Sequence, residues 1–366
     1  MTSTKTTTAP PARSALWPAG AGVILILGAA VWLACALGAD APRAWRALLV
    51  SFIYFTPMAA GMAVWPAVAR VARGQWAGPA ERSAFAAVAF APVSLAAFAG
   101  LWIGRDSWAG WTHYADLENA AWVNTPFIFA REAVALVFIW VLIAWFVRRA
   151  GRERCRRFAA WTIFAYCIVF SLVALDFVMA LDPHWASALF GVYFFVSAMY
   201  AGEAAWTLAS LVHRRTDTRR RHDLGKLIVA FSLLTTYMMF SQLVVIWYGN
   251  FPEEVRFVIP RLRFDRWGGV SAALLAVVYL GPLVLLLVRR SKLSAGYLAA
   301  VALAVLAGLW LERWWLVTPT LGGEMTLGLP ELSITAAMAA ALVLAIALFD
   351  RWAPHEAAQA EEVAAP

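Results

Sequence analysis

The sequence predicts an all-α polytopic membrane protein with ten transmembrane helices. Of its 366 residues, 63% are hydrophobic and only 14% are charged, which is too little polar surface to cover a soluble domain of this size. Apolar runs of about 20 residues, the length that crosses a bilayer, occur ten times. They lie near residues 18–38, 44–68, 83–103, 126–147, 157–181, 187–212, 224–248, 267–289, 296–316 and 331–350.

The first run has features of a secretory signal, because Lys5 and Arg13 precede it and small residues follow it. Its apolar part is longer than the core of a typical signal, so we interpret it as a membrane helix. The ends of the chain are rich in Thr, Ala, Pro and Glu and poor in core-forming residues. We therefore expect disordered cytoplasmic tails at 1–16 and 352–366 around one ten-helix transmembrane domain, 17–351.

The basic residues predict the orientation, because Lys and Arg are retained on the cytoplasmic side of a membrane. With the N-terminus inside, most of the 30 Lys and Arg fall in cytoplasmic segments. The densest clusters follow the fourth and sixth runs, at 148–157 and 214–226. Both termini are therefore predicted to be cytoplasmic, and the net charge of +8 is interpreted as a topology signal rather than as a nucleic-acid-binding surface. The clusters also suit anionic lipid headgroups.

The histidines and cysteines argue against a bound metal or haem. The five histidines fall in loops or tails, so no pair is placed to ligate a haem inside the bilayer. The three cysteines are scattered and have no paired spacing. If the chain takes part in redox chemistry, we expect the cofactors in partner subunits or a lipid-soluble quinone as the carrier. The residues are His113, His184, His213, His222 and His355, with Cys35, Cys155 and Cys167.

Two acidic residues lie inside the apolar runs. Asp176 is in the fifth run, close to its outer end, and Glu203 lies deeper in the sixth run. An ionised carboxylate in hydrocarbon costs several kcal/mol, so both are candidates for proton handling, as the outer and inner parts of one proton route. The alternatives are a solvated or hydrogen-bonded Asp176 and a protonated, purely structural Glu203.

Polar residues at helical spacing accompany these acids. In the sixth run they share one face with Glu203, at Tyr193, Tyr200, Thr207 and Ser210. In the second and seventh runs, hydroxyl residues also share faces, but Ser, Thr and Gly at such spacing usually serve helix packing in membranes. We favour packing for the hydroxyl and glycine residues, which are Ser51, Tyr54 and Gly61 in the second run and Ser232, Thr235 and Thr236 in the seventh; Gln242 shares the face of the latter three.

The outer loop 105–131 is rich in aromatic residues, and most of these are expected to form an interfacial belt: Trp102, Trp108, Trp111, Tyr114 and Trp122. Arg131 and Glu132 fall in the first turns of the fourth helix. They form either a snorkelling pair or part of a polar pocket near Asp182 and His184, and we slightly favour the pocket. The His184 imidazole is able to exchange protons near neutral pH, although a loop histidine is more often simply solvated.

Three segments resemble one known family: WVNTPFIFAR (122–131), LDFVMALDPHWASALFGVYFF (175–195) and FSQLVVIWYGNFPEE (240–254). They are similar to the ActF family, the second of the two NrfD-like, polysulfide-reductase-type membrane subunits of alternative complex III. This complex is a quinol:cytochrome c oxidoreductase of the bacterial inner (cytoplasmic) membrane. The resemblance covers roughly the second to eighth runs. It implies two four-helix bundles, runs two to five and six to nine, flanked by the first and tenth runs.

The resemblance also implies a function within a complex. In the family, quinol is oxidised near the periplasmic face, and electrons leave through iron-sulfur and c-type haem subunits to cytochrome c or a terminal oxidase. The other NrfD-like subunit is the better candidate for quinol binding, so this chain is expected mainly to carry protons and hold the assembly together. The candidate quinone pocket comprises Asn124, Arg131, Asp176 and His184. Asp182 is a further proton-handling candidate, and Glu253 is a motif residue of unknown role.

Two alternatives come from other functional classes. A secondary transporter also uses buried acids, but its broken helices usually correspond between two halves. The breaks expected here, at Pro57, Gly61 and Pro66 and at Gly281 and Pro282, do not correspond. A purely structural membrane anchor is the other alternative. We expect an integral subunit of a quinol-oxidising complex that binds lipid and partner subunits, carries no metal of its own, is not catalytic alone and binds no nucleic acid.

Overall fold

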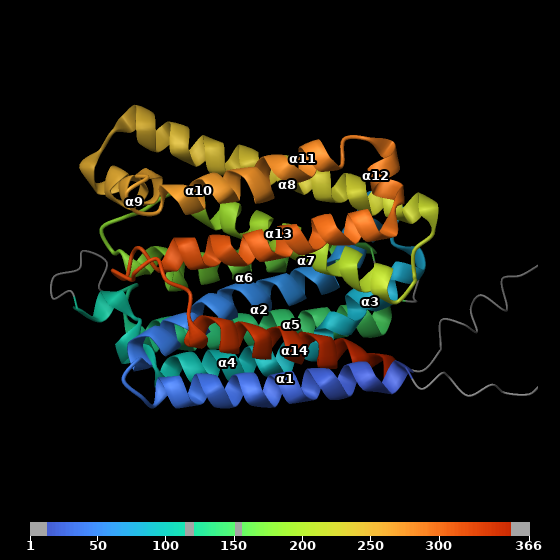
Figure 1. Ribbon diagram of the computed structural model, residues 1–366, viewed down its shortest axis with the longest axis horizontal. Coiled ribbons are helices and arrows are strands. Elements are labelled where there is room, and N and C mark those ends of the chain that lie inside the picture. Colours follow the sequence, from blue (N-terminus) through green and yellow to red (C-terminus); the bar gives the residue numbers. More distant parts are fainter. Residues whose placement is uncertain (1–12, 114–120, 151–155, 353–366) are drawn as a thin grey trace, which may run out of the picture.

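The computed structural model describes residues 13–113, 121–150 and 156–352, and within these ranges it contains helices and turns but no strand. The long helices run side by side along the longest axis of the molecule (Figure 1). The predicted all-α membrane fold is confirmed. The predicted tails fall mostly outside the described residues, and the first and last helices extend a few residues into them, to Arg13 and Trp352.

The helices follow one another with short connections. The first half contains α1 (Arg13–Ala36), α2 (Ala41–Ala72), α3 (Glu81–Phe85), α4 (Ala91–Ile103), α5 (Thr125–Arg149) and α6 (Arg156–Phe177). The second half contains α7 (Phe190–Val212), α8 (Thr218–Gly249), α9 (Pro252–Leu262), α10 (Gly268–Leu274), α11 (Gly281–Leu285), α12 (Arg289–Leu293), α13 (Ala295–Val317) and α14 (Leu329–Trp352). Short 3₁₀ segments are η1 (Gly78–Ala80), η2 (Ala86–Phe90), η3 (Arg105–Ser107), η4 (Gly110–His113) and η6 (Met179–Leu181), and η7 (Leu275–Leu280) is a π-helix.

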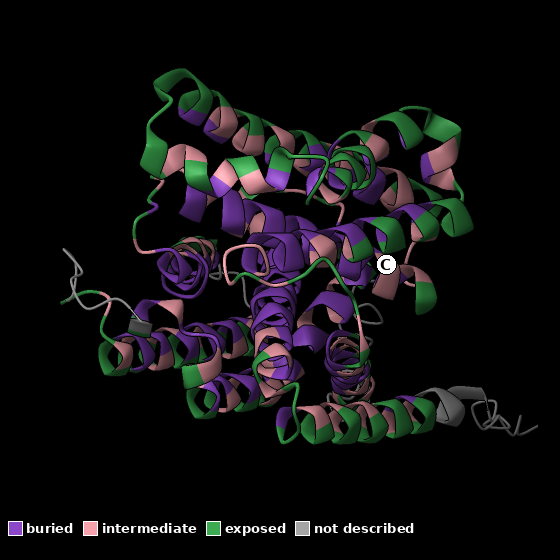
Figure 2. Cartoon of the chain, turned by 60° about the vertical axis from the view of Figure 1, so that its left-hand side comes forward, coloured by how far each residue is buried: buried purple, intermediate pink, exposed green. Residues whose placement is uncertain are grey.

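Nine helical segments of the described chain are long and apolar enough to cross a membrane. The exception among the ten predicted spans is α7, whose tyrosines, Glu203 and small residues lower its hydropathy. This helix packs against α2, α6, α8 and α13, so its surroundings are protein on most sides. Figure 2 shows the buried residues concentrated in such central helices and the exposed residues on the outer ones. A helix enclosed in this way does not need an apolar surface for lipid.

The helices form two rings of four. In the first ring α2 packs on α4 and α6, and α5 closes the ring between them; in the second ring α7 packs on α8 and α13, and η7 closes it. These rings agree with the two bundles expected from the resemblance. The bundles meet through α2 and α7, while α14 covers α2 and η2 and α1 lies on α14.

Glycine allows α2 and α7 to approach closely. A Cβ atom at Gly202 of α7 would lie 2.6 Å from the Met62 amide nitrogen and 2.8 Å from the Gly61 carbonyl carbon of α2. Beside this crossing, the Trp65 indole donates a hydrogen bond of 3.0 Å to the Met199 carbonyl. Small residues at a crossing let backbones touch and gain dispersion contacts in a membrane. Gly61 therefore serves helix packing, as the sequence predicts.

The eighth span is irregular because it contains the π-helix η7 followed by Pro282. Proline has no amide hydrogen, so the carbonyl four residues earlier, at Val278, lacks its usual helical partner. Hydroxyls from neighbouring helices donate there instead: Ser232 bonds the Val278 and Tyr279 carbonyls at 3.3 and 2.5 Å, and Thr236 bonds the Tyr279 carbonyl at 3.3 Å. These two hydroxyls of α8 thus hold a broken helix in place.

The structure corrects part of the predicted aromatic belt. Trp108 and Trp111 are buried, because the 3₁₀ turns after α4 fold back over the bundle, and Trp108 packs against Phe129 and Phe177. Trp102 and Trp122 remain exposed, as a belt requires. The predicted belt position of Tyr114 lies outside the described residues.

Candidate functional site

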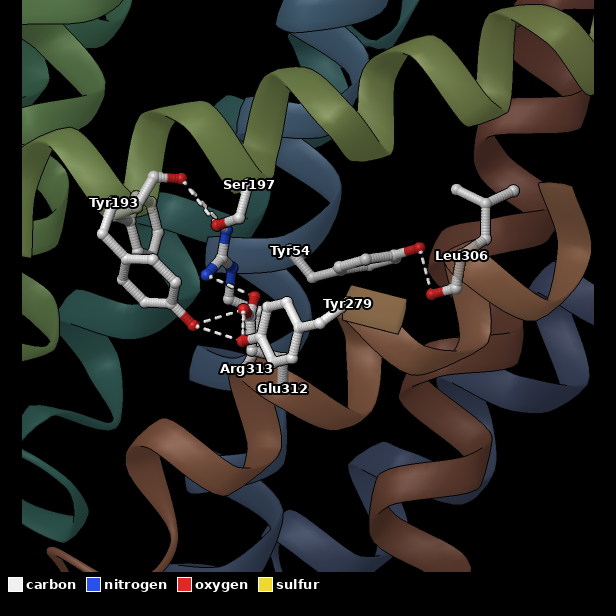
Figure 3. A network of polar contacts seen from close by, with 8 residues as sticks. Tyr54, Tyr193, Ser197, Tyr279, Leu306, Glu312 and Arg313 are labelled. Atoms are coloured by element: carbon white, nitrogen blue, oxygen red, sulfur yellow. Dashed lines mark hydrogen bonds and ion pairs between the residues drawn. The ribbon is translucent and has the colours of Figure 1, made fainter. Parts of the chain in front are cut away.

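An ion pair lies inside the second bundle, on two consecutive residues of α13. The carboxylate of Glu312 and the guanidinium of Arg313 are 3.0 Å apart, and both side chains are at most 2% exposed (Figure 3). Arg313 also donates to the Ser197 hydroxyl at 2.8 Å and to the Phe194 carbonyl at 3.2 Å, both on α7. A buried charge is tolerated only when it is paired and hydrogen-bonded, and both conditions hold here.

Two tyrosines complete this Glu312 network. The hydroxyls of Tyr193 on α7 and Tyr279 on η7 both donate to Glu312 Oε1, the second over 2.8 Å, and the two hydroxyls are 3.1 Å apart. Nearby, the Tyr54 hydroxyl donates to the Leu306 carbonyl at 2.8 Å, which ties α2 to α13 (Figure 3). The network therefore joins a carboxylate, an arginine and two phenols in one hydrogen-bonded group.

Glu203 lies on the same helix as Tyr193, farther from the α9 end of the bundle. Its carboxyl is fully buried and accepts one hydrogen bond, from the Thr207 hydroxyl at 2.8 Å. Its second oxygen has no partner among the described residues. Because none of the described residues forms an ion pair with this carboxyl, ionising it costs several kcal/mol more than ionising a solvated one.

The polar residues of α7 form a continuous row. Their spacing of three or four residues places them on one face, and all are buried. This α7 row consists of Tyr193, Ser197, Tyr200, Glu203, Thr207 and Ser210. The row begins at the Glu312 network and extends about 25 Å along the helix at 1.5 Å per residue. Two of its oxygens, on Glu203 and Ser210, have no hydrogen-bond partner among the described residues, and such groups in a native protein usually bind water.

Asp176 forms a different site, at the end of α6. Its carboxylate accepts hydrogen bonds from Nε and Nη2 of Arg131 from α5, the Nε–Oδ2 distance being 2.6 Å. The guanidinium lies 4.0 Å from the ring centre of Trp122 and donates to the Trp122 carbonyl. The neighbouring Glu132 is fully buried, and its carboxyl lies beside that of Asp176.

The predicted quinone pocket is brought together only in part. Arg131 and Asp176 meet, but Asn124 is exposed and caps α5, where its side chain accepts from the Phe127 amide at 3.2 Å. His184 is exposed in the loop before α7. Asp182 pairs instead with Arg256 of α9 at 3.1 Å. The polar pocket expected near Asp182 and His184 is therefore divided between two ion pairs.

Glu253 is exposed in the first turn of α9. A carboxylate there interacts favourably with the positive end of the helix dipole, which gives it a structural role without a ligand. The helix itself was not predicted, because its 11 residues are too short to produce a clear hydrophobic run.

A cavity of about 290 Å³ opens beside the Glu312 network. It lies between the ends of α7, α8 and α13 that are nearest to α9, and it is closed by α9 and α10. Tyr193 and Tyr279 form part of its wall, and Arg261 of α9 forms another part. Burial lowers the pKa of Arg261 to about 9, which leaves it charged at neutral pH. It donates to the Trp315 and Leu316 carbonyls and so caps the end of α13.

Sequence reasoning did not single out Glu312, Arg313 or Tyr279. The signal was present, because LERWW places an acid and an arginine inside the ninth apolar run, by the criterion that identified Asp176. Within the described residues no cluster of three His, Cys, Asp or Glu side chains is placed to hold a metal ion. Comparison of the chain with protein-family models and with curated proteins finds no match.

Proposed function

We propose that the chain is a proton-handling integral subunit of a membrane quinol:cytochrome c oxidoreductase of the alternative complex III type. The observation that carries this proposal is the α7 row, which places buried polar groups along one helix face between the Glu312 network and the unpaired carboxyl of Glu203. A helix that only anchors other subunits has no need to bury so many titratable groups in its own core.

The groups present suit the transfer of protons. Carboxyl, phenol and hydroxyl groups both donate and accept hydrogen bonds, so a proton is able to move along a row of them. Glu312 is balanced by Arg313, whereas Glu203 has no cation beside it among the described residues. The two carboxyls therefore differ in the free energy of ionisation, which is the property that separates a donor from an acceptor.

The α7 row changes the residue that we place at the outer end of the proton route. Both carboxylate oxygens of Asp176 are held by Nε and Nη2 of Arg131, so a proton binds there only when this pair opens. Glu312 of α13 lies where this helix packs against α7, and it accepts a hydrogen bond from Tyr193, the first residue of the row. We therefore assign the outer position of the route to Glu312 and keep Glu203 as the inner position. Asp176 and Asp182 remain candidates at the α9 end.

The association with a redox complex is supported by the three segments that resemble the ActF family. The first two meet through the ion pair of Arg131 and Asp176. The second also reaches α9, the helix in which the third segment ends, through the ion pair of Asp182 and Arg256. All three thus gather at the α9 end, which the loop charges predict to be periplasmic. That surface is where we propose that iron-sulfur and c-type haem subunits bind.

The proposal is tested by purifying the tagged chain from its native membrane in a mild detergent and identifying the bound proteins by mass spectrometry. We expect iron-sulfur and multihaem c-type subunits, a second NrfD-like chain and quinol:cytochrome c reductase activity. Recovery of the chain alone, together with solute uptake in proteoliposomes, would contradict the proposal and favour a secondary transporter. An intact complex whose proton transfer is indifferent to Glu203→Gln would favour a structural anchor.

A further inference from the structure

A polar cavity opens at the end of the molecule opposite α9, between the loop that follows α2 and the first turns of α8 (Figure 1). It measures about 340 Å³, within the range of about 300–1,000 Å³ that is usual for small-molecule sites. The two elements lie in contact there, because the Arg220 guanidinium of α8 packs against Gly78 of η1. The residues that line the cavity are Gln75, Trp76, Arg219, Asp223, Lys226 and Leu227.

The wall carries positive charge that its one carboxylate does not balance. Arg219 is exposed, and its side chain forms neither a hydrogen bond nor an ion pair with any other residue in the described part of the chain. Lys226 has one long contact, with the Asp223 carboxylate at 3.4 Å. Two cations and one carboxylate leave the lining with a formal charge of +1. Arg219 and Lys226 are seven residues apart and share one face of α8, so both reach the same anionic group.

The opposite wall is aromatic and fixed in place. The Trp76 ring packs against the buried rings of Trp65 and Trp206, with centroid distances of 5.8 and 5.6 Å. Neither the Trp76 indole nor the Gln75 amide has a hydrogen-bond partner within the described residues. Both groups donate hydrogen bonds, as do Arg219 and Lys226. A ligand that satisfies this wall therefore offers several acceptor oxygens on a negatively charged group, as a phosphate does.

The cavity lies at the head of a helix face that is exposed and largely apolar. Ala230, Leu233 and Tyr237 continue the face of Lys226 and are exposed. They extend over about 16 Å of the helix at 1.5 Å per residue. Lys226 lies about 35 Å from the Gly249 end of α8 on the same measure, close to the bilayer's hydrocarbon thickness of about 30 Å. This distance places the cavity at the level of the lipid headgroups.

The combination of a charged cavity and an apolar face selects the kind of ligand. A water-soluble anion uses the two cations but leaves the exposed face of α8 uncovered. A zwitterionic phospholipid covers that face, but its own cation enters a wall that already has a net positive charge. A phospholipid with a net negative charge suits both parts, since basic residues next to a membrane helix attract anionic lipids.

We infer that this cavity binds one anionic phospholipid, with its phosphate between Arg219 and Lys226, its headgroup against Gln75 and Trp76, and an acyl chain along the exposed face of α8. The loop charges predict the leaflet on this side to be the cytoplasmic one. The bound lipid connects the loop after α2, in the first bundle, with α8 of the second bundle. The site lies apart from the α7 row, so the inference goes beyond the proposed function and does not depend on it.

The test is native mass spectrometry of the full chain in a mild detergent with equal amounts of phosphatidylglycerol, which is anionic, and phosphatidylethanolamine, which is zwitterionic. We expect one phosphatidylglycerol to be retained in preference and to raise the melting temperature, because it binds the folded chain. Arg219→Gln should reduce its retention about fivefold, which corresponds to about 1 kcal/mol. Arg219→Lys keeps the charge and should retain most of the lipid.

Arg290→Gln is the matched control, because it removes the same charge from α12, which packs on α8, at an exposed residue that does not line the cavity. Its lipid retention should stay unchanged. Gln75→Glu is a second variant, and it places another carboxylate in the wall. Gln75 is exposed and has no hydrogen bond within the described residues, so this variant should lose the lipid without a lower melting temperature in lipid-free detergent.

Three outcomes would overturn the inference. The first is equal retention of the two phospholipids by the unaltered chain. The second is displacement of phosphatidylglycerol by excess glycerol 3-phosphate or a poly-glutamate peptide, which would indicate a site for a soluble anion or an acidic protein. The third is an equal loss of lipid in Arg219→Gln and Arg290→Gln. These measurements need no redox subunits, so failure of the lipid site and failure of the proposed function are distinguishable.

Discussion

Glu312 and Arg313 are consecutive in the sequence, and their side chains form a 3.0 Å ion pair inside the second bundle. The pair presents its carboxylate to two tyrosines and its guanidinium to the Ser197 hydroxyl of α7. One neutral pair thereby organises hydrogen bonds from three segments of the bundle.

Removal of one member of this pair should destabilise the protein strongly. Arg313→Leu leaves the Glu312 carboxylate buried without a cation, which costs about 3–5 kcal/mol of unfolding free energy. The double variant Glu312→Gln with Arg313→Leu leaves no buried charge and should recover most of that loss. Denaturant unfolding in detergent measures both. A double variant as unstable as Arg313→Leu alone would show that the ion pair is not the source of the effect.

The Asp176 and Arg131 pair should behave as a structural contact. Asp176→Asn loses a charged, bidentate contact worth about 1.5–3 kcal/mol per hydrogen bond, so stability should fall. Turnover per folded molecule should change little, because Arg131 already neutralises the carboxylate. Unfolding free energy and quinol:cytochrome c reductase activity of the purified complex test this. Normal stability with abolished turnover would instead support the original interpretation of Asp176 as a proton-handling residue.

Close packing of α2 and α7 should not tolerate a side chain at Gly202. Gly202→Ala places a Cβ atom 2.6 Å from the Met62 amide nitrogen, and the resulting helix shift should cost about 1–3 kcal/mol. Gly296→Ala is the matched control, because no atom lies within 4 Å of its Cβ position near the start of α13. Thermal unfolding of the two variants should separate them clearly. Equal melting temperatures would contradict the assigned role of Gly202.

The start of α8 should be sensitive to acid. Asp217 caps this helix by accepting from the Arg220 amide at 2.7 Å, and this hydrogen bond lowers the pKa of its carboxyl. A lowered pKa in the folded state stabilises the fold at pH values above the ordinary Asp pKa, and that stabilisation is lost as pH falls through the lowered value. Amide hydrogen exchange in the first turn of α8 should therefore accelerate below about pH 4. Asp217→Asn keeps a capping oxygen and should remove the pH dependence.

The sequence predicts the membrane fold well because bilayer thickness imposes a length on each apolar run. The face of α7 that carries Glu203 was also predicted, since residues three or four apart share a side. The partner of Asp176 was not predicted, because Arg131 lies 45 residues away in the sequence. The hydrophobic periodicity of each helix does not determine which helices are neighbours in the membrane plane. Glu312 and Arg313 could have been found as charged residues inside the ninth apolar run, but their hydrogen-bonding to Tyr193 of α7 and Tyr279 of η7 depends on the same unpredicted helix order. The π-helix η7 depends on hydroxyls donated by α8, which no local pattern reveals.

The most direct test of the proposed proton route is proton uptake and release by the purified complex in sealed vesicles, measured with a pH-sensitive dye during quinol oxidation. Glu203→Gln keeps the size and the hydrogen-bonding shape of the side chain but cannot ionise. Glu331→Gln is the control, because Glu331 is a buried carboxylate paired with Arg43 away from the α7 row. We predict that Glu203→Gln abolishes proton transfer or reduces it at least about tenfold, because a general acid–base group usually contributes a factor of about 10²–10⁴. Glu331→Gln should leave proton transfer intact. Unchanged proton transfer in a folded Glu203→Gln complex would contradict the account.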